Sequence, residues 1–157
     1  HDLTFRHRTT TNNRTFYASE GSGRNMGDTS VQHNAVPGII GFIFGMFFQY
    51  LDLRFTAYYP NPMQYALLLA IVASPLIAKL TGIPASKDHM FGVGVVALPL
   101  AILWFLGFSY FVFAIPGILW IWMSVSWPQY HLPPFRIGVW HGMGIAFTAF
   151  VGVLMIA

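Results

Sequence analysis

Residues 90–127 read MFGVGVVALPLAILWFLGFSYFVFAIPGILWIWMSVSW and contain no charged side chain. The hydrocarbon core of a bilayer is about 30 Å thick, and roughly 20 apolar residues of helix are needed to cross it. At about 1.5 Å per residue, one helix over this whole stretch would be far longer than the core. We therefore predict two membrane-spanning helices, at about residues 90–106 and 111–127, with a turn near Gly107.

Further apolar runs lie on both sides of this stretch, at about residues 36–55, 63–82 and 137–157. Proline marks the breaks between runs, as in Tyr59-Pro60-Asn61-Pro62, because it removes a backbone donor and restricts the preceding residue. The pattern predicts an all-α fold, a polytopic transmembrane helical bundle of five spans. A four-span alternative merges the third and fourth runs into one helix.

Composition supports this fold class. The chain is 55% hydrophobic and 17% aromatic, with only 8% charged residues, whereas soluble domains average about 25% charged residues. It has no cysteine, which excludes disulfides, thiolate metal sites and iron–sulfur clusters within this chain.

The N-terminal residues differ from the rest, since more than half of the charged residues lie within the first 28 positions. We predict a polar tail over residues 1–35, extended or ordered by a partner, because its Thr, Asn, Arg, Gly and Ser favour disorder in isolation. The tail's arginines alternate with acids and form no basic face, so the sequence does not indicate a nucleic-acid partner.

The basic residues predict an orientation. Five spans place the tail, the second–third loop and the fourth–fifth loop on one side of the membrane. Basic loops stay on the cytoplasmic side, so we expect the N-terminus in the cytoplasm or its organellar equivalent. We also expect an energy-transducing membrane, because respiratory and photosynthetic complexes are the commonest hosts of small subunits with several spans. That side collects every basic residue except Arg54, namely Arg6, Arg8, Arg14, Arg24, Lys79, Lys87 and Arg136.

Small residues recur four positions apart in the first and fifth spans. The pairs are Gly41 and Gly45, Gly138 and Gly142, and Gly144 and Thr148. Such pairs let two helix backbones approach closely. We expect both spans to pack against another helix, within this chain or outside it.

His141, in the fifth span, is the candidate cofactor ligand. A neutral imidazole can ligate a haem iron or a chlorophyll magnesium, and Gly142 beside it leaves room for a ring. A bis-histidine haem needs a second ligand at similar depth, for which His89 at the start of the third span is the candidate. The alternative, which we favour, is that His141 bonds a carbonyl or hydroxyl on a neighbouring helix. The spacing of His131 and His141 places them on no common helix face, so we predict no other metal site.

Aromatic residues gather near the predicted span ends, among them Trp120, Trp122 and Trp140. Their rings favour the headgroup zone, so we predict that they anchor the helices there. No Asp, Glu, Lys or Arg lies at the centre of a predicted span, which disfavours a pump or transporter. No phosphate-binding loop, nucleophile elbow or paired carboxylate is present, so we name no catalytic residue and expect no catalytic activity.

These observations leave three functional hypotheses. The first, which we favour, is an accessory structural subunit of a larger membrane complex, such as a respiratory or photosynthetic electron-transfer assembly. Its partners would be other membrane protein subunits and bound lipids. The second is a cofactor-binding subunit with His141 as haem or chlorophyll ligand. The third is a channel, transporter or membrane enzyme that acts alone.

Overall fold

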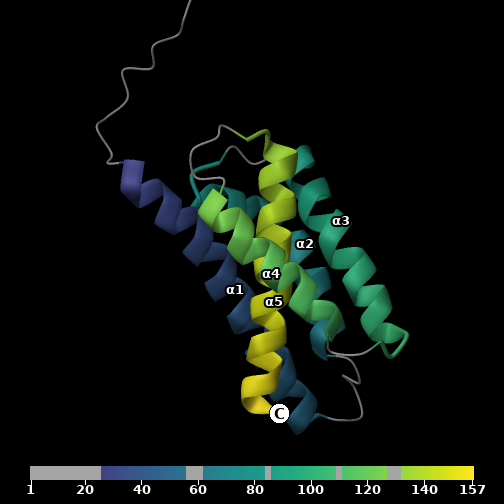
Figure 1. The fold of residues 1–157 in the computed structure, drawn as a ribbon. Helices are drawn as coiled ribbons and strands as arrows, with labels where there is room; N and C mark the ends of the chain where they lie inside the picture. The colour runs from purple at the N-terminus through teal and green to yellow at the C-terminus, as the bar shows by residue number, and fades with distance from the viewer. Residues whose placement is uncertain (1–25, 56–61, 84–85, 109–110, 127–131) are drawn as a thin grey trace, which may run out of the picture.

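The computed structural model describes residues 26–55, 62–83, 86–108, 111–126 and 132–157, and these residues form helices with short connections. The predicted all-α class is confirmed, since the described residues include no strand. The helices are α1 (Met26–Arg54), α2 (Pro62–Leu80), α3 (Lys87–Phe105), α4 (Phe111–Ser126) and α5 (Pro134–Ile156) (Figure 1).

Among the described helices, four are long and apolar enough to cross a membrane: Ala35–Arg54 within α1, and the whole of α2, α3 and α5. Helix α4 is equally apolar but has only 16 residues, or about 24 Å at 1.5 Å per residue. The merged helix of the four-span alternative does not form. Helix α3 ends at Phe105 and α4 begins at Phe111.

Two glycines end helices α2 and α3, the second of them at the turn predicted near Gly107. Gly82 after α2 and Gly107 after α3 have φ angles of 77° and 75°, which side chains rarely tolerate. Beyond each glycine, the next N–H donates to a carbonyl five residues back: Ile83 to Ala78 and Phe108 to Leu103. This is the Schellman arrangement that closes helix C-termini. The chain therefore reverses sharply after α2 and after α3.

Helix α1 begins at Met26 rather than at Val36, where we predicted the first span. Residues 26–35, which we predicted to be the end of the polar tail, therefore form the first part of α1. The rest of that tail, residues 1–25, lies outside the described residues.

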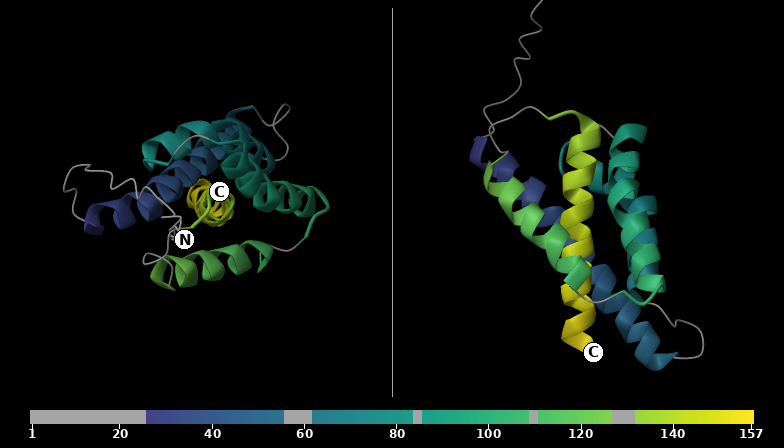
Figure 2. Two further views of the ribbon diagram at one scale, coloured as in Figure 1. Left: turned by 90° about the horizontal axis from the view of Figure 1, so that it is seen from above. Right: turned by 45° about the vertical axis from the view of Figure 1, so that its right-hand side comes forward.

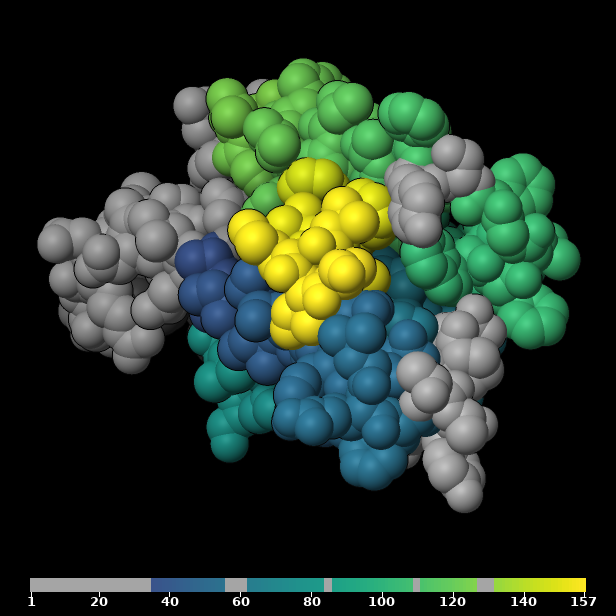
Figure 3. Space-filling model, turned by 90° about the horizontal axis from the view of Figure 1, so that it is seen from below, coloured from purple at the N-terminus to yellow at the C-terminus, as the bar shows by residue number. Residues whose placement is uncertain are grey.

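Helix α5 lies at the centre of the bundle. Seen along its axis, α1, α2 and α3 curve around one side of α5 and α4 lies on the other (Figure 2). The space-filling view from the end where α5 terminates shows the same arrangement (Figure 3). Successive helices alternate in direction, so the α2–α3 turn lies at the same end as the start of α5 (Figure 1).

Small residues allow α1 and α5 to touch. A Cβ atom on Gly41 would lie 2.7 Å from the Cα of Ile145, and one on Gly45 would lie 2.9 Å from the Cα of Ala149. Gly152 of α5 is closed off in the same way by the backbone of Phe42. The predicted close packing of these two spans is confirmed, and it occurs within this chain.

Candidate functional site

Three buried polar side chains form a continuous hydrogen-bonded row across α2, α3 and α5. Ser74 Oγ lies 2.8 Å from His89 Nδ1, and His89 Nε2 lies 3.0 Å from His141 Nδ1. The two imidazole rings meet edge to face, with centroids 5.2 Å apart and planes at 73°. All three residues are 0% exposed. We call Ser74, His89 and His141 the polar triad.

The start of α3 positions His89. Ser86 caps this helix, and its Oγ accepts a hydrogen bond of 3.1 Å from the backbone N–H of His89. His89 therefore lies in the first turn of α3, near the end of the bundle that holds the α2–α3 turn. Ser74 lies in α2, beside the proline of that helix, Pro75.

Glycines bring α3 and α5 close enough for their histidines to meet. A Cβ on Gly138 would collide with the carbonyl oxygen of His89, and one on Gly92 would lie 2.8 Å from the backbone nitrogen of Val139. Further along, a Cβ on Gly142 would lie 3.2 Å from the Cα of Val93. The contact is thus backbone against backbone, and it brings the two rings within hydrogen-bond distance.

The hydrogen bonds of the triad allow two neutral proton arrangements. In one, Ser74 donates to His89 Nδ1, and His89 Nε2–H donates to His141. In the other, His141 Nδ1–H donates to His89, whose Nδ1–H donates to Ser74. In either arrangement, the Ser74–His89 contact and the His89–His141 contact each have one donor and one acceptor, and both rings are neutral. A neutral, hydrogen-bonded row is the form in which polar side chains are tolerated among transmembrane helices.

The structure brings together the two histidines that the sequence singled out. Both ring nitrogens of His89 lie within hydrogen-bond distance of protein atoms, so coordination of a haem iron by His89 would break one of these bonds. His141 meets His89 through Nδ1, so a cofactor would have to be bound through Nε2. Within the described residues, no three His, Cys, Asp or Glu side chains are grouped to hold a metal ion. Cofactor binding by His141 stays a prediction.

Ser74 is the member of the triad whose role the sequence did not indicate. In the sequence, Ser74 stands out only as a hydroxyl within an apolar helix. Such hydroxyls often donate to a carbonyl of their own helix. Thr81 does so, donating to the carbonyl of Ile77 at 2.9 Å. Which serine meets a histidine depends on helix register, which the sequence does not contain.

A second polar contact joins α4 to α5. Trp140 Nε1 donates to Ser124 Oγ at 3.1 Å, and Ser124 in turn donates to the carbonyl of Trp120. Trp140, which we predicted to anchor in the headgroup zone, has a side chain that is only 5% exposed and faces α4. Its ring fills the space between two helices.

The polar side chains described above therefore join neighbouring helices through hydrogen bonds. Comparison with known proteins adds no identification: the chain matches no protein-family model, no curated protein and no solved structure.

Proposed function

We propose that this chain is a structural, non-catalytic subunit of a larger membrane complex. The observation that carries the proposal is that Ser74, His89 and His141 are fully buried and bond to one another. Transporters and pumps usually keep ionisable side chains along a water-lined path. A polar row enclosed by α2, α3 and α5 instead supports a rigid framework.

Helix α4 is the surface on which we place a partner subunit. It packs chiefly against α5, and its outer residues are widely exposed, with Phe111 at 82% and Val125 at 79%. At about 24 Å, it is shorter than the roughly 30 Å hydrocarbon core. The backbone groups at its ends need partners within the membrane. A neighbouring protein helix against α4 would supply them and cover its apolar side.

As the host complex we propose an electron-transfer assembly of a respiratory or photosynthetic membrane. Such assemblies contain many small subunits with several spans and no chemistry of their own. This choice of host follows from their frequency and from no particular residue of this chain.

Extraction in mild detergent, followed by a native gel and identification of co-migrating proteins, tests the proposal. We expect the chain to migrate in a complex much larger than its own 17.6 kDa. The double variant Ile118→Ala/Trp122→Ala removes exposed bulk from α4 and should release the chain from the complex. Val72→Ala/Leu76→Ala is the matched control, because it trims exposed residues on α2 and should leave the complex intact.

The same preparation separates the proposal from its alternatives. Migration as a bare monomer with measurable transport after reconstitution would contradict it in favour of a protein that acts alone. A visible absorption band that is lost in His141→Ala would favour haem or chlorophyll binding. A colourless pure chain would rule out that cofactor role.

A further inference from the structure

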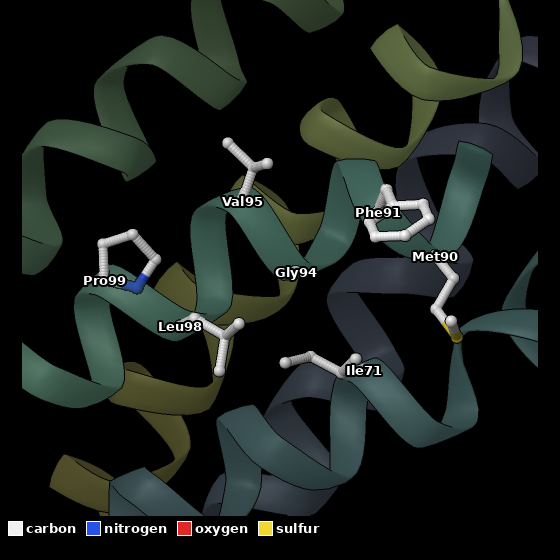
Figure 4. A pocket seen from close by; sticks show the side chains of 7 residues that line it. All are labelled: Ile71, Met90, Phe91, Gly94, Val95, Leu98 and Pro99. Carbon is white, nitrogen blue, oxygen red and sulfur yellow. The ribbon is translucent and has the colours of Figure 1, made fainter. Parts of the chain in front are cut away.

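An apolar groove with a volume of about 430 Å³ runs along α3 where this helix meets α2. Helix α2 contributes Ile71, which points toward Leu98 of α3 across the groove (Figure 4). Gly94 leaves the floor open, since a Cβ built there would meet nothing within 4 Å. The remaining lining residues, all from α3, are Met90, Phe91, Val95 and Pro99. We call this feature the α2–α3 groove.

The groove has the length of one bilayer leaflet. From Met90 to Pro99 the helix rises about 14 Å, at 1.5 Å per residue. Half of a hydrocarbon core of about 30 Å is about 15 Å. The groove begins one turn below the start of α3 at Lys87, near one end of the bundle. An acyl chain of the leaflet at that end would therefore lie along it.

Lys87 heads the same helix face that lines the groove. Met90, Phe91, Gly94, Val95 and Leu98 follow Lys87 at three, four, seven, eight and eleven positions, the spacing of one α-helical face. Lys87 is exposed, and so is Lys79 in the last turn of α2, which ends at the same turn. The ends of α2 and α3 here carry one exposed acid, Asp88. The rim of the groove is thus net positive.

We propose that the α2–α3 groove binds an anionic diacyl phospholipid, with an acyl chain over Gly94 and the phosphate at Lys87 and Lys79. Basic residues at the headgroup level beside an apolar slot are the combination that retains an anionic lipid. The outer side of α4 is equally apolar, yet none of its residues is charged. Helix α4 therefore offers no basic residue of its own to an anionic headgroup. The proposal holds whichever proteins surround the chain.

Lipid retention after reconstitution tests the proposal. The full chain, with any proteins that co-purify, is placed in nanodiscs of equal phosphatidylglycerol and phosphatidylcholine, released into detergent and analysed by native mass spectrometry. We expect one phosphatidylglycerol per chain to be retained and phosphatidylcholine to be lost. The single variants Lys79→Gln and Lys87→Gln should each weaken the retention of phosphatidylglycerol about 5-fold. The double variant Lys79→Gln/Lys87→Gln should weaken it about 30-fold.

Two control variants make the result specific. Arg136→Gln removes one positive charge from an exposed site at the same end of the bundle but on α5, and should retain the lipid. A Cβ at Gly94 would have nothing within 4 Å, so Gly94→Phe places its ring in the groove and should lose the lipid. Val125→Phe adds the same ring on exposed α4 and should keep the lipid. Equal retention of both lipids would overturn the proposal. So would an effect of Arg136→Gln equal to that of Lys87→Gln, or full retention by Gly94→Phe.

Discussion

Replacing Gly92 with leucine is expected to lower the free energy of unfolding by about 3 kcal/mol, at the upper end of the cost of overpacking. A Cβ at Gly92 would lie 2.8 Å from the nitrogen of Val139 and 2.9 Å from the carbonyl carbon of Gly138. These are backbone atoms, so no side-chain rotation relieves the clash. Helices α3 and α5 must separate, which also pulls His89 from His141. The melting temperature in detergent should fall by about 6–12 °C.

Gly94→Leu is the matched control for this prediction. Gly94 lies in the same helix, two residues away, and a Cβ there would have nothing within 4 Å. Gly94 is buried, but its side chain would enter the apolar groove rather than meet a neighbouring backbone. We therefore expect the free energy of unfolding to change by less than about 0.5 kcal/mol, because no clash is created. If Gly94→Leu destabilised the protein as much as Gly92→Leu, the cost would come from the loss of glycine itself. The close contact between α3 and α5 would then be wrong.

Replacing His89 with leucine should have the second largest effect, about 2–4 kcal/mol. The substitution removes both hydrogen bonds of the triad and leaves His141 Nδ1 and the Ser74 hydroxyl in apolar surroundings. Leaving a buried polar group unsatisfied costs about 1–3 kcal/mol. Chemical denaturation in detergent, followed by circular dichroism, measures the difference.

Ser74→Ala gives the graded comparison for His89→Leu. It breaks only the 2.8 Å contact to His89 and keeps the bond between the histidines. Hydrogen bonds between membrane helices average about 0.6 kcal/mol, so we expect a loss of about 1 kcal/mol or less. A His89→Leu protein as stable as the wild type would show that the triad does not hold α2, α3 and α5 together.

The helices of this protein follow from its sequence because their causes are local. Uncharged runs predict the spans, and Gly82 and Gly107 adopt the positive φ angle that closes a helix C-terminus. The predicted ends of spans two to five agree with α2 to α5 within a few residues. The start of α1 was missed because Met26 precedes its apolar run, and a helix can continue into polar sequence.

The triad could be predicted only in part. The sequence placed His89 and His141 near the same end of the bundle, because both lie near the starts of helices that run in the same direction. That the rings touch depends on the closeness of α3 and α5, which Gly92 and Gly138 allow together. The sequence does not show which helix each glycine contacts, because contacts between helices depend on how the whole bundle packs. The same reason explains why the sequence does not show that Trp140 packs against α4.

Site-directed labelling tests the membrane threading most directly. These 157 residues include no cysteine, so each introduced cysteine is the only one among them. In sealed membranes treated with an impermeant maleimide, we predict that Lys87→Cys and Arg136→Cys react from one side and Arg54→Cys from the other. Val72→Cys, midway along α2 and facing outward, should stay unlabelled until the membrane is dissolved. Reaction of Lys87→Cys and Arg136→Cys from opposite sides, or rapid labelling of Val72→Cys in intact membranes, would contradict the transmembrane bundle described above.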